Sequence, residues 1–108
     1  MADPIRVLVV DDDLAHAEMV VEFLRLTGAW ADADIDTASS YEDALNVLTI
    51  NKYDLAFFDY LLGSRDGLAL LREVRQQGIT TPVVVLTSRG AEDVAVEAMK
   101  AGAADYLS

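Results

Sequence analysis

Three groups of oxygen-bearing side chains stand where they could carry chemistry. Asp11-Asp12-Asp13 follows one apolar run, Asp59 ends another, and Thr87-Ser88 follows a third. If these runs are neighbouring parallel strands, their carboxyl ends lie at one edge of the sheet and the three groups converge. Carboxylates in one cleft repel each other unless a cation is present. The pattern predicts a divalent-ion site, and Mg²⁺ fits best because it takes one or two protein carboxylates and keeps positions for water and phosphate oxygens.

A carboxylate, a divalent ion and a hydroxyl together suggest that an acyl phosphate forms on Asp59. Carboxylates are nucleophiles of this kind, and a hydroxyl such as that of Thr87 can donate to a phosphoryl oxygen. Each group also has a plain structural interpretation, since Asp11–Asp13 and Thr87-Ser88 could be helix caps and Asp59 a turn residue. The conjunction favours the chemical interpretation, because independent caps have no reason to share one edge with an acid after the central strand.

The elements that must position these residues alternate along the chain. Short apolar runs predict strands at residues 5–10, 34–38, 55–59, 83–86 and 103–107. Helical spacing of apolar residues predicts helices at about 14–27, from 41 to a stop at 51, at 67–77, and before a stop at 102. We expect Gly28 to end the first helix in the left-handed conformation, and Asn51 to end the second in the same way. Strands that alternate with helices predict a parallel sheet covered on both faces.

Composition narrows the classes of function. The 108 residues predict one domain, and a hydrophobic fraction of 53% is ample for a core. Nineteen acids against eight bases give a net charge of −11, which argues against direct binding to nucleic acid. The chain has no cysteine, so disulfides are excluded. Its apolar runs are far shorter than the roughly 20 residues of a membrane span, and no signal-peptide pattern opens it, so we expect a cytoplasmic protein.

Five motifs in this order resemble the receiver domain of two-component response regulators, the CheY-like superfamily. They are Val9-Val10-Asp11-Asp12-Asp13, Asp59, Asp66-Gly67, Leu86-Thr87-Ser88 and Gly102-Ala103-Ala104-Asp105-Tyr106-Leu107. The resemblance implies a doubly wound, flavodoxin-like α/β fold with a parallel five-stranded sheet in the order 2-1-3-4-5. It also implies that Asp59 helps to bind Mg²⁺ and accepts a phosphoryl group from a histidine kinase, a histidine phosphotransfer protein or a small phosphodonor. Phosphorylation would then change the affinity of the domain for its partners.

The resemblance assigns further roles residue by residue. Asp11 and Asp12 are expected to hold Mg²⁺, with Asp12 as the more direct ligand, and Leu61 to lend its backbone carbonyl. Thr87 is the expected switch hydroxyl, and Tyr106 the aromatic that changes rotamer when Thr87 moves. As a member of this family the domain would be a signalling module that catalyses only its own phosphorylation and dephosphorylation. The sequence does not identify the kinase or the output domain or partner, and a homodimer through the fourth helix and fifth strand is possible.

The sequence also departs from the family pattern. The family has a Lys just after the fifth strand and then a last helix, whereas this sequence stops at Ser108. We therefore expect residues 1–108 to be a receiver domain truncated before its last helix. His16, Arg72 and Arg75 are expected to be solvated surface residues, and Asp13 to cap the first helix.

Two rival functions remain. An aspartyl-nucleophile phosphatase would carry an acid two residues after the nucleophile, where this sequence has Leu61, which argues against it. A CheY-like interaction module that is never phosphorylated would be expected to lack the acidic pair or the acceptor. All of these are present, and only the missing Lys leaves this alternative open.

Overall fold

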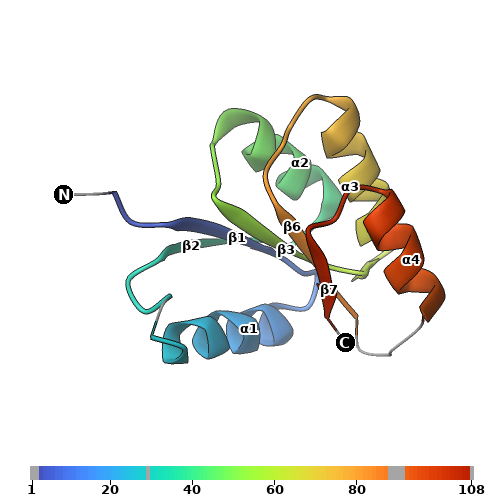
Figure 1. The fold of residues 1–108 in the computed structure, drawn as a ribbon. Helices are drawn as coiled ribbons and strands as arrows, with labels where there is room; N and C mark the ends of the chain where they lie inside the picture. The colour runs from blue at the N-terminus through green and yellow to red at the C-terminus, as the bar shows by residue number, and fades with distance from the viewer. Residues whose placement is uncertain (1–2, 29, 88–91, 108) are drawn as a thin grey trace.

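Five strands of the computed structural model form one parallel sheet. The structure describes residues 3–28, 30–87 and 92–107. The strands are β1 (Arg6–Val10), β2 (Asp34–Ala38), β3 (Leu55–Asp59), β6 (Val83–Leu86) and β7 (Asp105–Leu107), in the order β2-β1-β3-β6-β7 (Figure 1). Counted along the chain this is 2-1-3-4-5, so the predicted fold class and strand order are confirmed. The last strand starts at Asp105 rather than at 103, because Ala103 N still donates to Ala98 O of α4 (Glu92–Lys100).

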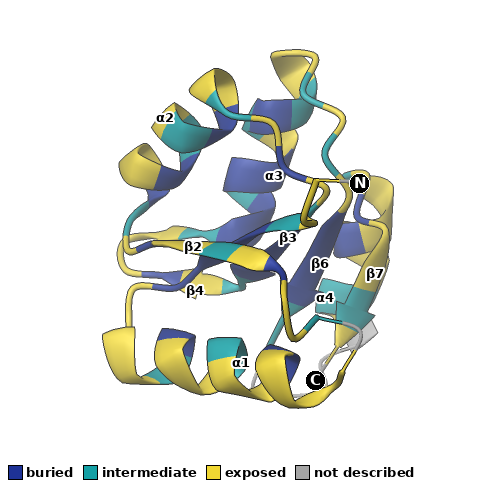
Figure 2. Cartoon of the chain, turned by 90° about the vertical axis from the view of Figure 1, so that its left-hand side faces the viewer, coloured by how far each residue is buried: buried dark blue, intermediate teal, exposed yellow. Residues whose placement is uncertain are grey.

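Helices cover both faces of this sheet. Helix α1 (Leu14–Leu26) lies on one face, and α2 (Tyr41–Ile50), α3 (Gly67–Gln76) and α4 lie on the other (Figure 1). Side chains of a strand alternate between the faces, so β1 contributes Val7 and Val9 to the core beneath α1 and Leu8 and Val10 to the core beneath the other helices. The interiors of β1, β3 and β6 are therefore buried on both sides, whereas the edge strands β2 and β7 are largely exposed (Figure 2).

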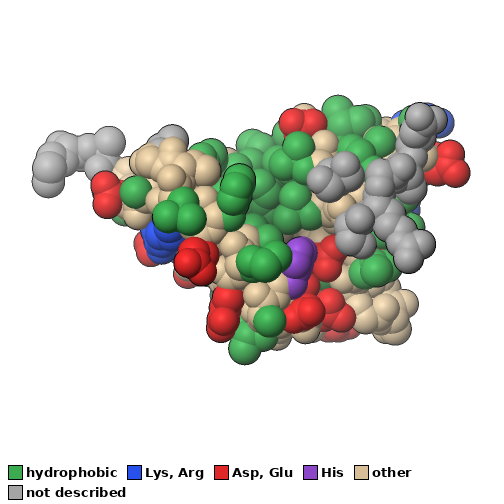
Figure 3. Space-filling view, turned by 90° about the horizontal axis from the view of Figure 1, so that it is seen from below, with side chains coloured by type: hydrophobic (Ala, Val, Ile, Leu, Met, Phe, Trp, Pro, Cys, Tyr) green, Lys and Arg blue, Asp and Glu red, His purple; other side chains and the backbone are tan. Residues whose placement is uncertain are grey.

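The two cores differ in extent. The core on the side of α2, α3 and α4 contains the largest fully buried side chain, Phe58, and several leucines. Of the helices that the structure describes, α1 alone covers the opposite face, and its Met19, Phe23 and Leu26 remain 63–79% exposed. Apolar side chains are consequently visible on the surface around α1 (Figure 3).

The ends of the helices follow the predicted stops with one exception. Gly28, Gly78 and Gly102 all have positive φ, at +73°, +79° and +102°. The prediction of a left-handed Asn51 is wrong, because its φ is −121° and the chain continues in an extended conformation. A side chain that contains a Cβ is strained at positive φ, and Asn51 ends α2 without needing that conformation.

A short hairpin that was not predicted follows β3. Strands β4 (Leu61–Leu62) and β5 (Arg65–Asp66) pair antiparallel, and Gly63 turns between them with a φ of +70°. Asp66 then caps α3 by accepting a hydrogen bond from Ala69 N at 2.8 Å. Gly67 lies so close to the end of β3 that a Cβ atom there would overlap the backbone oxygen of Asp59. The glycine therefore lets the hairpin and α3 fold back directly against the predicted acceptor.

Arg75 corrects the prediction of a solvated helix face. Its guanidinium donates to the backbone oxygens of Ile79 and Thr81, each at 2.8 Å, and of Gly102 at 3.0 Å. It thus ties the end of α3 to the connection before β6 and to the turn after α4. Arg72 is exposed as predicted. Local spacing placed both arginines on the same helix, but only the tertiary fold brings carbonyl groups to Arg75.

None of the helices in the described ranges is both long enough and apolar enough to span a bilayer.

Candidate functional site at the carboxyl edge of the sheet

The central strands bring the predicted site residues to one edge of the sheet. Asp59 ends β3 and pairs with Leu86 of β6, while Asp11 follows β1 on the other side of β3. Thr87 follows β6, and its backbone N–H donates to Leu107 O at 3.0 Å. Parallel pairing of these strands is therefore what gathers residues that lie far apart in sequence. The other hydroxyl of the predicted pair, Ser88, lies outside the described residues.

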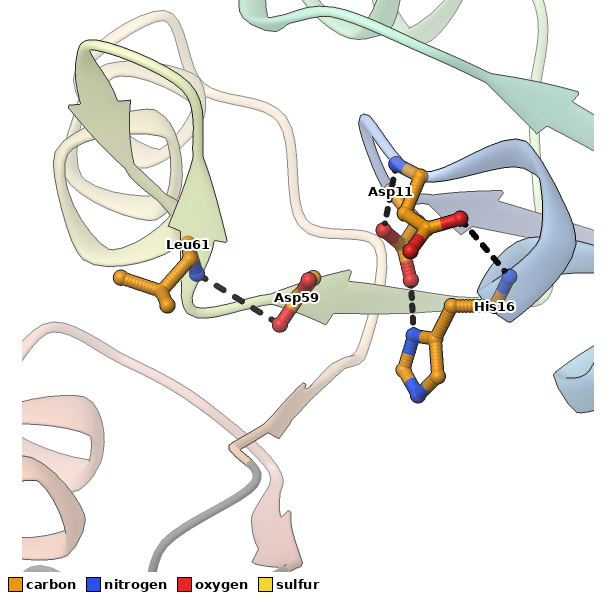
Figure 4. A network of polar contacts seen from close by, with 5 residues as sticks. Asp11, His16, Asp59 and Leu61 are labelled. Carbon is orange, nitrogen blue, oxygen red and sulfur yellow. Dashed lines mark hydrogen bonds and ion pairs between the residues drawn. The ribbon is translucent and has the colours of Figure 1, made fainter.

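Asp11 is the fixed member of this group. Its side chain is 2% exposed, and its Oδ1 accepts a hydrogen bond from Asp13 N at 2.9 Å. Its Oδ2 contacts Nδ1 of His16 (Figure 4). Asp13 itself caps α1 as predicted, since its Oδ1 accepts from His16 N at 3.2 Å. The first turn of α1 thus holds the buried carboxylate in one orientation.

Asp59 is the partly buried member and faces a like charge. Burial, followed by the negative charge of Asp11, raises the pKa of Asp59 from 3.8 to about 6. The backbone N–H of Leu61 donates to Asp59 Oδ1 at 3.5 Å and opposes this shift, as does the nearby His16 (Figure 4). Without a cation the site is therefore electrostatically unfavourable for the Asp59 carboxylate.

His16 lies at the surface as predicted, but it also contacts Asp11 and belongs to the site, which was not predicted. One ligand atom from each of Asp11, His16 and Asp59 lies within 4.8 Å of the other two. The hydrogen bond to Asp11 raises the pKa of His16, whereas burial works in the opposite direction. The side chain keeps 40% exposure, and Figure 3 shows the single histidine at the surface beside acidic side chains. Its position in the first turn of a helix that follows Asp11 was the available signal.

Asp12 is placed differently from Asp11. Its side chain is exposed, and its Oδ2 would lie 3.9 Å from a Cβ at Gly63, which places it beside the β4–β5 hairpin. The group of three potential ligands found among the described residues includes Asp11 and not Asp12. Of the predicted acidic pair, the structure thus brings Asp11 together with Asp59 and leaves Asp12 at the rim.

A pocket of about 340 Å³ opens over this group. Asp11, Asp13, His16, Asp59 and Thr87 supply its polar wall, and three leucines supply the rest: Leu61, Leu86 and Leu107. The pocket combines carboxylates, an imidazole and a hydroxyl in one water-accessible space. Such a set can hold a small anion only together with a cation, because its own charge is negative.

The sequence of residues 7–108 matches the response regulator receiver domain family. This chain belongs to that family. It is 35% identical over 105 residues to the transcriptional regulatory protein ZraR of Escherichia coli K12, across 97% of this chain and 23% of ZraR. It is 36% identical over 104 residues to the response regulator MprA of Mycobacterium sp. strain KMS, across 96% of this chain and 44% of MprA. The receiver domain described here thus spans less than half the length of either relative.

Solved structures agree with this membership. The receiver domain of the Francisella response regulator 1452 has a TM-score of 0.79 at 31% identity, covering 97% of this chain and 83% of that one. A two-component response regulator from Clostridium difficile has a TM-score of 0.82 at 30% identity, covering 95% of this chain and 81% of that one. The fold and the family are therefore shown by sequence and structure alike.

The acidic group of this receiver domain fits a divalent cation. Receiver domains generally bind Mg²⁺, and here two carboxylates face one another at the base of a pocket open to water. The raised pKa of Asp59, caused by burial and by the charge of Asp11, is the signature of carboxylates that a cation would stabilise. The donor oxygens are those that Mg²⁺ prefers.

Tyr106 lies on the other side of the last strand from the pocket. It is half-buried, and it neighbours Val85 in the pairing of β7 with β6. Leu107 lines the pocket above α1, so by alternation Tyr106 points to the face that carries α4. Tyr106 thus lies on β7, and Thr87 lies directly after the adjacent strand β6.

Proposed function

We propose that this receiver domain accepts a phosphoryl group on Asp59 and that phosphorylation switches its affinity for partners. The observation that carries the proposal is the position of Asp59. It is a partly buried carboxylate at the end of the central strand, in a pocket that it shares with Asp11 and Thr87. Strand ends at this edge of an open α/β sheet are where ligands bind.

The reaction is a transfer between a donor and the Asp59 carboxylate. A carboxylate oxygen attacks phosphorus of a phosphohistidine on a histidine kinase or phosphotransfer protein. The new P–O bond forms as the P–N bond breaks, and its electron pair stays with the donor imidazole, which takes up a proton. Acetyl phosphate can replace the protein donor, with acetate as the leaving group. Attack by water later releases inorganic phosphate and restores the carboxylate, so the domain acts only on itself.

The residues that would hold Mg²⁺ are Asp11, Asp12, Asp59 and the backbone carbonyl of Leu61. When bound, the ion would neutralise charge on the transferring phosphoryl group. Asp11 is already fixed by Asp13 N, whereas the exposed Asp12 needs to turn from the hairpin toward the pocket. The protein itself positions the acidic side chains, because the strand ends and the first turn of α1 fix where they lie.

Thr87 and Tyr106 are proposed to register phosphorylation. The Thr87 hydroxyl would donate to a phosphoryl oxygen, and Tyr106 would change rotamer as Thr87 moves. The surface of α4 and β7 would then differ between the two states, which is what a change in partner affinity requires. Because the chain spans 23% of ZraR and 44% of MprA, we propose that it works with an output domain or partner. A homodimer through α4 and β7 would use the same surface.

Labelling with acetyl phosphate and Mg²⁺ tests the acceptor, with intact-mass spectrometry as the readout. The wild type should gain one phosphoryl group and Asp59→Asn none. Asp54→Asn is the matched control, because Asp54 precedes the same strand at the opposite edge of the sheet and is exposed. It should be labelled like the wild type. Undiminished labelling of Asp59→Asn would remove Asp59 from the role. An unlabelled wild type that still binds partners would favour an unphosphorylated interaction module.

A further inference from the structure

We propose that His16 is a ligand of the cation site and that the site therefore prefers a divalent first-row transition ion of the class of Zn²⁺ and Co²⁺ over Mg²⁺. This inference rests on the proposed function, because it concerns the ion that supports the acceptor Asp59. The ligands would be Nδ1 of His16 with one carboxylate oxygen each from Asp11 and Asp59.

The distances between the three groups suit such an ion. Bonds from Zn²⁺ to nitrogen and oxygen are about 2.0–2.2 Å long, so two ligand atoms of a tetrahedral ion are about 3.3–3.6 Å apart. The ligand atoms of Asp11, His16 and Asp59 lie within 4.8 Å of one another. Small side-chain rotations would therefore bring all three onto one ion without movement of the backbone.

The backbone positions of the ligands are already set. Asp11 is held by Asp13 N, and the same Asp13 caps the turn that carries His16. The ring nitrogen of His16 that faces the carboxylate of Asp11 is Nδ1 (Figure 4). Nδ1 donates to Asp11 in this contact, so a bound ion would displace that proton and leave the neutral tautomer with its proton on Nε2, whose Nδ1 lone pair points at the cluster. With 40% of the side chain exposed, an ion can enter from solvent.

The chemistry of the donors decides the class of ion. Mg²⁺ takes oxygen ligands, and an imidazole adds little to its binding. Imidazole is a good ligand for Zn²⁺, Co²⁺ and their neighbours, which also accept carboxylates. Two carboxylates balance the charge of one divalent ion. Adding one nitrogen to an oxygen site thus favours the transition ions selectively, and a pocket that also includes Thr87 leaves room for water or a phosphoryl oxygen.

The structure also allows a contrary role, in which His16 only occupies Asp11 and competes with every cation. The two roles predict opposite effects of removing the imidazole. If His16 is a ligand, His16→Ala should weaken Zn²⁺ binding at least about tenfold and should not weaken Mg²⁺ binding. If His16 is only a competitor, His16→Ala should strengthen the binding of both ions. Calorimetric titrations of the untagged protein with Zn²⁺ and with Mg²⁺ distinguish these two outcomes.

Coordination by nitrogen can be observed directly with Co²⁺. The chain has one histidine, so a bound imidazole should give one far-shifted, solvent-exchangeable ring proton in the ¹H NMR spectrum of the untagged Co²⁺ complex. That proton should be absent from His16→Ala and from His16→Gln, of which the second keeps a polar side chain if the first folds poorly. Asp59→Asn should bind Co²⁺ more weakly but keep the proton.

A Co²⁺ complex without the shifted proton would overturn the assignment, as would equal changes in Zn²⁺ and Mg²⁺ affinity on removal of His16. Phosphoryl labelling of the wild type in Mg²⁺ tests the acceptor function of Asp59 separately from metal coordination by His16. Labelling of Asp59 without nitrogen coordination refutes only the role of His16. Nitrogen coordination without labelling of Asp59 refutes only the acceptor function.

Discussion

Asp59→Asn should stabilise the metal-free protein at neutral pH. The wild-type carboxylate is charged at pH 7.5, and both its burial and the neighbouring Asp11 disfavour that charge, as the rise in the pKa of Asp59 to about 6 records. Asparagine has nearly the same shape and carries no charge. The substitution therefore removes an unfavourable charge while keeping an amide oxygen that can accept from Leu61 N.

The size of the effect follows from the two pKa values. A rise from 3.8 to about 6 corresponds to about 3 kcal/mol for a charge fully shielded from solvent. Asp59 is only partly buried, so screening by water reduces the expected gain to about 1–2 kcal/mol. For a domain of this size that is a rise in melting temperature of roughly 5–10 °C.

The pH dependence has a definite sign. Between about pH 4 and pH 6 the folded protein holds the Asp59 proton more tightly than the unfolded chain, so the contribution of Asp59 to stability falls as pH rises. Above about pH 6 the penalty is complete. The stability gain of Asp59→Asn over the wild type should accordingly be near zero at pH 4 and reach its full value above pH 6.

Urea denaturation in the presence of a chelator, at half-unit steps from pH 4 to 8, measures this difference. Asp54→Asn controls for the loss of a carboxylate just before the same strand, and it should show no such gain because its amide oxygen can still accept from Arg6 N. Saturating Mg²⁺ should reduce or reverse the difference in unfolding free energy between Asp59→Asn and the wild type, because the ion stabilises the wild-type carboxylate. A loss of stability in Asp59→Asn at pH 7.5, or a gap that does not vary with pH, would refute the electrostatic reasoning.

Two further substitutions test how the fold supports the site. Arg75→Met should lower the free energy of unfolding by about 2–3 kcal/mol, since it leaves partly buried carbonyls without their charged donor. The control Arg72→Met changes an exposed arginine on the same helix and should change the free energy of unfolding by less than about 1 kcal/mol. Both values come from urea denaturation. Gly67→Ala should cost about 2 kcal/mol in melting experiments, because its Cβ would overlap the Asp59 backbone oxygen, and should reduce phosphoryl labelling. Gly78→Ala, which meets open space and suffers only from positive φ, should cost about 1 kcal/mol and leave labelling intact.

The positions of the helices and strands could be predicted from sequence because they depend on neighbouring residues. Short β-branched runs such as that of β6 favour strands, and Gly28, Gly78 and Gly102 adopt the left-handed conformation that ends a helix. The acids after β1 and β3 could be predicted to meet, because parallel strands place their carboxyl ends together. Strand order itself came from the family resemblance rather than from local pattern.

The partners of individual side chains were decided only by the tertiary structure. Helical spacing put His16 on the outer side of α1, yet the turn that follows β1 carries its ring to Asp11. Arg75 shares a helix with Arg72, but only the chain after α3 and the turn before β7 supply its carbonyls. Which member of the acidic pair lies next to Asp59 likewise depends on how that turn is built. Such contacts join segments distant in sequence, so their distances exist only once the sheet and its helices have assembled.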